Sequence, residues 1–371
     1  MSVPAREPYK VGNGPPSSEA LCFFVYQNIT ATMKLGRRPA LTKNFVLEYT
    51  PPAHKGKMEE TIQKLLPGVR KQESLSRHTT FRIGGPARYF FTATNSDAII
   101  RALQAAKKLR LSVFILSGGS NVVMSDAGFP GLVIQIRNSK FKIRNFRVDA
   151  EAGVLCSSLV KATVHRGLEG LEWAGGLPGS LGGAIRGNAG AFGGEIKDAV
   201  VSVEAIDEKG RMHVFSKKQC RFSYRSSIFK EKKYIVLSAV LGLVKGDAKE
   251  LSKIARSHML YRKERHPLEY PNAGSMFKNC DAKKLPVRWK KHFANVMKID
   301  PFPVIPTAAI IAAAGLKGLR VGNVQVSQKH PNYIVNLGKG RAKDVVRLVE
   351  KVKQKVKKKF GIVLEEEIQF V

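Results

Sequence analysis

The sequence predicts an α+β fold, because helical and strand patterns are mixed along the chain without a strict βαβ repeat. The chain has 371 residues, of which 43% are apolar and 25% charged, so it can bury a sizeable core in two or three domains. No window reaches 18 consecutive apolar residues, and we expect no membrane span.

The elements are predicted from caps, periodicity and turn residues. In chain order we expect a helix capped by Asn95, strands at 113–116 and 132–136, a helix at 158–166 ending at Gly167, a hairpin of strands at 200–206 and 212–215, a strand at 234–243, and a helix at 248–262. Trp173 and Tyr270 are expected to pack in the interior. The first 57 residues carry Pro/Gly/Ser clusters and no sustained period, so we expect a disordered extension there.

The formal net charge of +34 is the most unusual bulk property, and residues 1–57 account for only +5 of it. Its densest run, 351–359, lies on a stretch where Val345, Val349, Val352, Val356 and Phe360 recur at helical spacing. We therefore interpret the lysines as the solvent face of a packed helix. The alternative is a nucleic-acid or anionic-membrane binder that uses residues 343–359, but no DNA-reading motif is present.

Cysteine and metal patterns are uninformative. The four cysteines, Cys22, Cys156, Cys220 and Cys280, lie far apart, which favours a reducing, cytoplasmic setting with each thiol a small buried hydrophobe. No His/Cys/Asp cluster has metal-ligand spacing, so we expect no metal site.

Three glycine-rich loops indicate a ligand with phosphate groups. Residues 117–121 (Ser-Gly-Gly-Ser-Asn) follow a predicted strand, so their backbone N–H groups could hold an anion. Residues 84–86 and 178–183 are further places where a backbone can approach a ligand closely. None of them is a dinucleotide fingerprint of the G-x-G-x-x-G kind.

The stretch 271–279 places the hydroxyl of Ser275 between a glycine turn and a lysine. Its distant companions are Arg225 and the acidic residues 365–367. A proton donor, a fixed cation and a carboxylate suit a reaction in which negative charge develops and is then protonated. The sequence therefore predicts an enzyme.

Many short motifs occur in one order along the chain. They lie at 78–87, 118–121, 125–126, 128–129, 170–172, 176–184, 186, 188–194, 224–227, 273–279, 314–318 and 364–367. In this order they resemble the flavin-dependent UDP-N-acetylenolpyruvoylglucosamine reductases of bacterial cell-wall synthesis. The resemblance covers roughly residues 72–371.

The resemblance implies non-covalent FAD in a two-part domain of the vanillyl-alcohol-oxidase type, followed by a separate α+β substrate domain. We expect the first domain at 58–247, with parts at 58–137 and 138–247, and the second at 248–371. It further implies that NADPH reduces the flavin and that UDP-N-acetylmuramate is the product. We expect a monomer that acts on a small sugar nucleotide and binds no nucleic acid. An FAD oxidase of the same fold with another substrate is the alternative enzyme.

By motif match, Ser275 is the proton donor, and Arg225 and Glu367 are the other catalytic groups. Arg225 could hold the developing charge bidentately, and it cannot lose its proton. Glu367 would help only if its pKa is raised or if it orients a donor; its choice over Glu365 rests on alignment. The cofactor-binding residues implied by the motifs are Thr80, Arg82, Gly84, Gly85, Ser117, Gly118, Gly119, Ser120, Asn121, Gly179, Ser180, Gly182, Gly183, Asn188, Ala189 and Gly190.

The substrate-binding residues are expected to be Lys263, Lys278, Asn279 and His330. The lysines could pair with a diphosphate or could simply be solvated, and His330 could be structural. The chain departs from the family at Ser117, where a third glycine is usual, and in having Glu366 where proline is common. It also has an insertion between Asn279 and Ala314.

Overall fold

The computed structural model describes residues 55–208, 210–299 and 302–371. The expectation for residues 1–54 lies outside these residues. Residues 55–57, also expected to be disordered, instead begin helix α1 (Lys55–Leu65). Within the described residues, every helix is too short or too polar to cross a bilayer.

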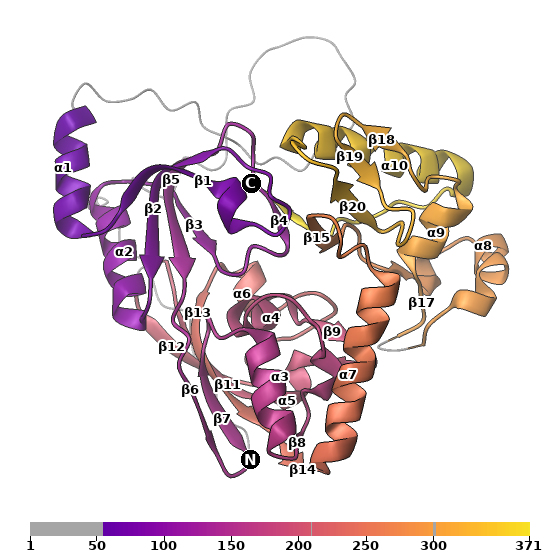
Figure 1. Cartoon of the computed structure of the whole chain (residues 1–371), viewed down its shortest axis with the longest axis horizontal. Coiled ribbons are helices and arrows are strands. Elements are labelled where there is room, and N and C mark those ends of the chain that lie inside the picture. Colours follow the sequence, from indigo (N-terminus) through magenta and orange to yellow (C-terminus); the bar gives the residue numbers. More distant parts are fainter. Residues whose placement is uncertain (1–54, 209, 300–301) are drawn as a thin grey trace, which may run out of the picture. The chain divides into compact units, whose positions relative to one another are not determined.

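The first sheet contains β1 (Arg70–Ser74), β2 (Pro86–Ala93), β5 (Phe129–Ile136) and β3 (Val113–Leu116), in that order across the sheet. β2 and β3 run parallel to β5, whereas β1 is antiparallel to β2. Helix α2 (Ser96–Lys108) lies alongside this sheet (Figure 1). The Asn95 side chain accepts a hydrogen bond from Ala98 N at 2.8 Å, which confirms the predicted cap.

The second sheet has the order β12-β11-β13-β7-β6 and is antiparallel throughout. Its strands are β6 (Phe141–Arg144), β7 (Arg147–Glu151), β11 (Val200–Ile206), β12 (Met212–Ser216) and β13 (Ile235–Gly242). The predicted hairpin is confirmed as β11 and β12. The helices of this part are α3 (Cys156–His165), α4 (Leu181–Gly187), α5 (Ile196–Ala199) and α6 (Ile228–Glu231).

Helix α7 (Ala248–Arg265) packs with this first part of the chain. Its Leu251 is buried in the same core as the two sheets, and Ala255 packs against that core. The expected domain boundary at 247/248 therefore falls before a helix whose packing belongs to the first domain. Trp173 is buried there too, as predicted, but Tyr270 is 44% exposed and the packing role expected for it is wrong.

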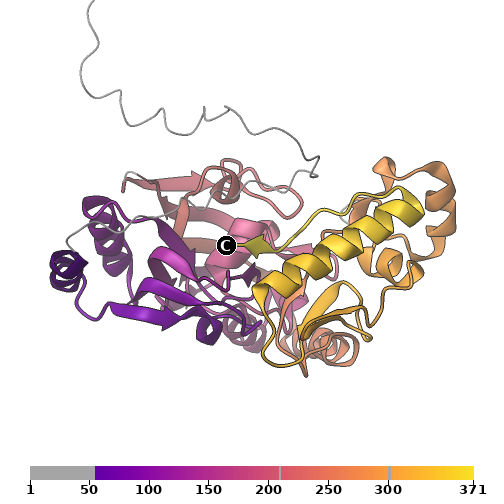
Figure 2. The ribbon, with the colours of Figure 1, turned by 90° about the horizontal axis from the view of Figure 1, so that it is seen from above.

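The C-terminal part has its own antiparallel sheet, β15 (Asn272–Ser275), β20 (Tyr333–Asn336), β19 (Val324–Val326) and β18 (Arg320–Val321). Helix α10 (Ala342–Phe360) lies along it (Figure 2). The five predicted apolar residues of this helix are all buried, whereas Lys351, Lys355 and Lys357 are exposed. The solvated-face interpretation is confirmed for this helix.

The insertion between Asn279 and Ala314 is closed at its base by a strand pair, β16 (Cys280–Asp281) and β17 (Val304–Ile305). It carries α8 (Val287–His292) and ends with α9 (Thr307–Ala313). The Trp289 ring lies 4.7 Å from Phe360 at the end of α10. This segment is therefore packed onto the C-terminal core.

Several short segments complete the fold. They are the strands β4 (Val122–Val123), β8 (Leu168–Glu169), β9 (Gly190–Ala191), β10 (Gly194–Glu195), β14 (Val244–Lys245) and β21 (Gln369–Phe370), and the 3₁₀ turns η2 (Leu75–His78), η3 (Glu172–Ala174), η4 (Ala282–Lys284) and η5 (Ala294–Val296).

Two contacts join the end of the chain to its beginning. β21 pairs in parallel with β4. The Asp126 carboxylate accepts hydrogen bonds from Ala342 N at 2.8 Å and Lys343 N at 3.0 Å, at the start of α10. A carboxylate at a helix N-terminus accepts hydrogen bonds from N–H groups that have no partner within the helix, and its negative charge interacts favourably with the helix dipole. Because of these contacts, the glycine loop at 117–121 lies beside the last residues of the chain.

Candidate active site

Two of the three predicted glycine loops meet. The Ser117 and Ser180 hydroxyls lie 2.6 Å apart. A Cβ added at Gly118 would lie 3.0 Å from the Gly179 Cα, so the two backbones touch at a position where a larger residue would press them apart. The loop 117–121 also contacts the turn at 79–80, because Thr80 N donates a hydrogen bond to Gly119 O at 3.1 Å.

This meeting point fits an anionic group. Within the described residues the backbone N–H groups of Gly118, Gly119 and Ser120 donate to no other residue. Gly119 is left-handed (φ +63°), and a Cβ there would lie 2.2 Å from the His78 carbonyl oxygen, so only glycine fits. Consecutive free N–H groups in such a turn form a concavity that binds phosphate.

The remaining predicted cofactor residues divide into two groups. Gly182, Gly183, Asn188, Ala189 and Gly190 lie on α4 or directly after it, in continuity with Ser180, whose hydroxyl accepts from Gly183 N. Gly84 and Gly85 instead face Met124 and Asp126, and a Cβ at Gly85 would meet the Asp126 carbonyl oxygen at 2.2 Å. Close packing, against the Met124 side chain at Gly84 and against the Asp126 backbone at Gly85, is enough to require glycine at both positions. Arg82 is exposed.

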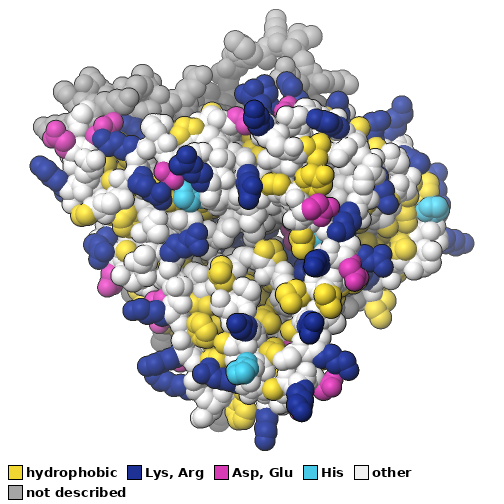
Figure 3. Space-filling view, in the orientation of Figure 1, with side chains coloured by type: hydrophobic (Ala, Val, Ile, Leu, Met, Phe, Trp, Pro, Cys, Tyr) yellow, Lys and Arg dark blue, Asp and Glu magenta, His cyan; other side chains and the backbone are white. Residues whose placement is uncertain are grey.

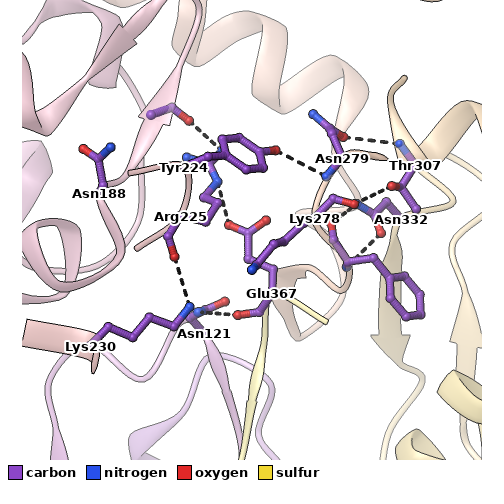
Figure 4. A network of polar contacts seen from close by, with 12 residues as sticks. Asn121, Asn188, Tyr224, Arg225, Lys230, Lys278, Asn279, Thr307, Asn332 and Glu367 are labelled. Atoms are coloured by element: carbon purple, nitrogen blue, oxygen red, sulfur yellow. Dashed lines mark hydrogen bonds and ion pairs between the residues drawn. The ribbon is translucent and has the colours of Figure 1, made fainter. Parts of the chain in front are cut away.

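Arg225 and Glu367, which are far apart in sequence, face each other (Figure 4). The Arg225 Nε lies 2.9 Å from a Glu367 carboxylate oxygen. Arg225 follows Tyr224 on the 220–227 loop and holds a left-handed backbone (φ +55°), which is unusual for a residue with a side chain. Strain of this kind is tolerated where surrounding contacts fix the geometry.

The charges around Glu367 are mainly positive. Burial raises the pKa of the Glu367 carboxyl, while Arg225, Lys230 and Lys278 act in the opposite direction. Burial also lowers the pKa of the Lys230 ammonium, and Lys278 and Arg186 lower it further. Three cations, Arg225, Lys230 and Lys278, therefore act on one largely buried carboxylate, which leaves an excess of positive charge for an anionic substrate.

Ser275 ends strand β15 and lies opposite Tyr333 on β20. Burial raises the pKa of the Tyr333 hydroxyl, and a hydrogen bond with the Ser275 side chain and the nearby Arg262 oppose this. Tyr333 also hydrogen-bonds His266 Nδ1 at 3.1 Å. Ser275 thus has a buried polar partner behind it.

Hydrogen bonds join each predicted catalytic segment to a predicted cofactor segment. Asn121 Nδ2 donates to Glu367 O at 3.2 Å, and Arg225 Nη2 donates to Gly190 O at 2.9 Å. Thr80 Oγ1 donates to Asn272 O at 2.7 Å, at the start of the strand that ends in Ser275. The structure therefore brings the two sets of residues together.

The predicted substrate residues are placed unequally. The Lys278 ammonium lies 3.1 Å from a Glu365 carboxylate oxygen, and Asn279 N donates to the Tyr224 hydroxyl at 3.3 Å. His330 is largely buried beside Tyr333, with Nδ1 unpaired among the described residues. Lys263 lies exposed on α7, and within the described chain no contact joins its ammonium to these groups.

Sequence reasoning missed Lys230, Arg262, His266 and Tyr333. Lys230 lies five residues after Arg225, and its ammonium donates to Arg225 O at 3.0 Å. Tyr333 lies in the same stretch as His330. These short spacings were available signals, but nothing in the sequence pairs Tyr333 with a histidine 67 residues earlier.

In the part of the chain that the structure describes, the basic side chains on the surface are dispersed, and so are the side chains that could bind a metal ion. Lys and Arg side chains are dispersed over the face seen in Figure 3, with no single basic patch. Among the residues that the structure describes, no group of three His, Cys, Asp or Glu side chains could hold a metal ion.

A turn whose backbone N–H groups have no partner among the described residues lies near the Arg225–Glu367 pair, an arrangement typical of cofactor-dependent enzymes, and the family comparisons are specific. The model of the FAD binding domain matches residues 87–216. The model of the UDP-N-acetylenolpyruvoylglucosamine reductase C-terminal domain matches residues 266–371. The second match begins after α7, consistent with the packing of that helix.

The matches to curated relatives extend over nearly the whole length of those relatives. UDP-N-acetylenolpyruvoylglucosamine reductases of Solibacter usitatus and Carboxydothermus hydrogenoformans are 38% identical over 305 residues and 37% over 318; the matches cover 82% and 85% of this chain and 96% and 98% of theirs. The crystal structure of UDP-N-acetylenolpyruvylglucosamine reductase from Thermus caldophilus is 30% identical, with a TM-score of 0.66, over 81% of this chain and 99% of that one.

The chain belongs to the UDP-N-acetylenolpyruvoylglucosamine reductase family. It is an oxidoreductase with an FAD-binding domain and a C-terminal domain of that family, and the predicted α+β fold class is confirmed. Its role in peptidoglycan precursor synthesis follows from this membership.

Proposed function

We propose that this protein uses NADPH and non-covalent FAD to reduce UDP-N-acetylenolpyruvoylglucosamine to UDP-N-acetylmuramate. The observation that carries the proposal is the set of hydrogen bonds Asn121–Glu367, Arg225–Gly190 and Thr80–Asn272. They connect segments suited to a phosphate-bearing cofactor with a cation, a carboxylate and a hydroxyl. Because the substrate is a nucleotide-activated sugar and the reductant NADPH, we assign the reaction to the cytoplasm.

The cofactor would be held mainly by backbone. The free N–H groups of Gly118, Gly119 and Ser120 suit the diphosphate of FAD, and Ser180 closes the turn through its contact with Ser117. When bound, FAD supplies the hydride that NADPH provides for the enolpyruvyl double bond. The remaining chemistry falls to side chains of the chain.

Arg225 would stabilise the negative charge that develops on the substrate, and Ser275 would donate the proton. Adding hydride to one vinyl carbon leaves negative charge at the other, conjugated with the substrate carboxylate. The Arg225 guanidinium, fixed by Glu367 and Gly190 O, suits that carboxylate. Ser275 would give its proton to the negative carbon, which completes the addition of H⁻ and H⁺.

The geometry supports Glu367 over Glu365 as the acidic catalytic residue. The Glu365 side chain is 73% exposed, whereas that of Glu367 is 21% exposed and contacts Arg225. A carboxyl group with a raised pKa can carry a proton near developing negative charge, where a carboxylate would repel it. Lys278 and Asn279 would bind the substrate diphosphate, with His330 and Lys263 further along the nucleotide.

The test uses the two half-reactions. The purified protein should show a flavin absorption spectrum, and anaerobic NADPH should bleach it. Adding UDP-N-acetylenolpyruvoylglucosamine should restore the oxidised spectrum and yield UDP-N-acetylmuramate. An enzyme that is reoxidised by oxygen but not by this sugar nucleotide would be an FAD oxidase, and the proposal would be wrong.

A further inference from the structure

Polar side chains lead from Ser275 away from the reaction centre. Tyr333 is 8% exposed, lies directly opposite Ser275 across β15 and β20, and hydrogen-bonds His266 Nδ1 at 3.1 Å. The Ser275 hydroxyl acts to lower the pKa of Tyr333, as a hydrogen-bonding neighbour does. His266 follows the last residue of α7, where it is partly exposed. The three groups therefore connect the proposed proton donor with solvent.

We propose that Tyr333 and His266 form a proton relay that orients the Ser275 hydroxyl toward the substrate and reprotonates it as it gives up its proton. The proposal rests on the proposed function, because it requires Ser275 to be the proton donor. It names two positioning residues that act through Ser275 and do not themselves touch the substrate.

The direction of the relay depends on the tautomer of His266. If Nδ1 carries the proton, it donates to Tyr333 Oη, Tyr333 donates to Ser275 Oγ, and the serine proton is free to face the substrate. If Nδ1 is bare, Tyr333 must donate to it, and Ser275 can then donate only back toward Tyr333. Productive geometry therefore requires the Nδ1–H tautomer.

The proton balance closes through the histidine. The Ser275 O–H bond breaks as the new C–H bond forms on the substrate. In the same step Tyr333 gives its proton to Ser275, and His266 Nδ1 gives its proton to Tyr333. His266 Nε2 takes one proton from solvent, so the three groups end with their original charges but with His266 as the Nε2–H tautomer. Exchange with solvent, in which Nε2 loses a proton and Nδ1 gains one, and rotation of the two hydroxyls restore the starting arrangement before the next turnover. One solvent proton is consumed for each hydride added.

The electrostatic surroundings keep the relay neutral. Burial, followed by His330, Arg262 and Lys329, lowers the pKa of His266 to about 4. The group is therefore uncharged above that pH, and a neutral imidazole can release a proton at one nitrogen while binding one at the other. Burial and the nearby Glu367 raise the pKa of Tyr333, so its hydroxyl keeps its proton between turnovers.

Two neighbours complete the environment. The His330 ring lies 5.2 Å from the His266 ring and 4.8 Å from the Tyr333 ring, and burial holds its pKa at about 4 as well. The Tyr261 ring lies 6.4 Å from the His266 ring. The other charged groups that face the relay are Arg262, Lys329 and Glu367. The two cations cannot accept a proton from it, and Glu367 acts on Tyr333 as a charge that raises its pKa.

The kinetic test compares Tyr333→Phe with wild type. The variant removes one oxygen and keeps the ring, so folding is checked simply by circular dichroism and Tm. Flavin reduction by NADPH should be unchanged. Reoxidation by UDP-N-acetylenolpyruvoylglucosamine should slow about tenfold or more, with KM for this substrate little changed, because a proton-transfer path is lost and a substrate contact is not.

Isotope data separate a relay from a structural role. In mixtures of H₂O and D₂O, the reoxidation rate of wild type should fall along a curve, because several protons move together, while that of Tyr333→Phe should fall linearly. His266→Asn keeps a donor near Nδ1 but cannot exchange tautomers, so it should reoxidise at an intermediate rate. Equal rates or equally shaped isotope plots for wild type and Tyr333→Phe would overturn the relay.

A spectroscopic test is independent of turnover. Nitrogen NMR of protein labelled at histidine, with His266→Asn used to assign the resonance, should show His266 as the neutral Nδ1–H tautomer at pH 7. An Nε2–H tautomer would contradict the proposal. If wild type is not reoxidised by the sugar nucleotide at all, the proposed function fails instead, and the two failures are distinguished.

Discussion

The candidate active site has two halves, of which one presents mainly backbone groups and the other presents side chains. The loops at 117–121 and 179–180 present backbone N–H groups, and their side chains are small. The cluster of Arg225, Glu367 and Ser275 presents side chains from three segments separated by long stretches of sequence. One half is made by turns and the other by tertiary packing.

This difference implies different failures on substitution. A change in a glycine turn adds atoms where two backbones meet, so it should weaken cofactor binding and the fold together. A change in the side-chain cluster removes a chemical group from a site that remains assembled. Substitutions in the two halves should therefore separate cofactor retention from turnover.

Replacing Ser275 by alanine should have the largest effect. The hydroxyl is lost while β15 keeps its pairing with β20, so FAD content and reduction by NADPH should stay normal. Reoxidation by the sugar nucleotide should slow by about 10²–10⁴-fold, the usual contribution of a positioned proton donor. Anaerobic stopped-flow absorbance measures both steps. Ser257→Ala, at an exposed site on α7, is the control, and a Ser275→Ala variant with normal reoxidation would rule out the donor role.

Replacing Gly119 by alanine should act on the other half. The new Cβ would lie 2.2 Å from the His78 carbonyl oxygen, and the residue would keep a left-handed backbone. We expect a protein that loses FAD on gel filtration and is destabilised by about 1–3 kcal/mol, in the range of backbone strain.

Gly68→Ala is the matched control for Gly119→Ala, since Gly68 is also left-handed but has nothing within 4 Å of an added Cβ. It should retain the flavin. If both variants bound FAD equally, close approach of the two loops would not be needed for the cofactor.

Replacing Glu367 by glutamine should change how stability depends on pH. The folded state raises the pKa of this carboxyl above its unfolded value, so its contribution to stability is complete below the unfolded pKa and declines as pH rises through the folded pKa. Glutamine stays neutral. The Tm of the variant relative to wild type should therefore be higher at pH 8 than at pH 4, and a difference independent of pH would show that the carboxyl is not shifted.

The sequence predicted local secondary structure better than it predicted tertiary contacts between distant segments. The strand at 113–116 and the buried face of α10 follow from patterns within a few residues of each other, and both are confirmed. The boundary at 247/248 stays a prediction, since a helix pattern does not show which core will bury its apolar side; Leu251 of α7 is buried in the core of the first part of the chain. The assignment of Gly84 and Gly85 to the cofactor site also stays a prediction; in the structure both pack closely against neighbouring parts of the chain.

The candidate site shows the same limit. Family motifs supplied Arg225, Ser275 and Glu367, but the contact between Tyr333 and His266 joins residues with no shared local pattern. Such a pair depends on how β20 lies beside the end of α7. Physical reasoning on a single sequence cannot provide that placement.

The smallest predicted effect concerns the contact between helix α10 and the segment that follows the glycine loop. Asp126 caps α10 through two backbone hydrogen bonds, from a segment next to the glycine loop. Asp126→Ala should cost about 1 kcal/mol, as loss of a cap usually does, and lower Tm by a few degrees. FAD content should fall only slightly and reoxidation should be unchanged, because neither set of binding groups is touched. Asp126→Asn keeps an acceptor oxygen and should recover about half of the stability; equal losses in Asn and Ala would show that the negative charge at the helix end, rather than the hydrogen bond, is what holds α10 to the first part of the chain.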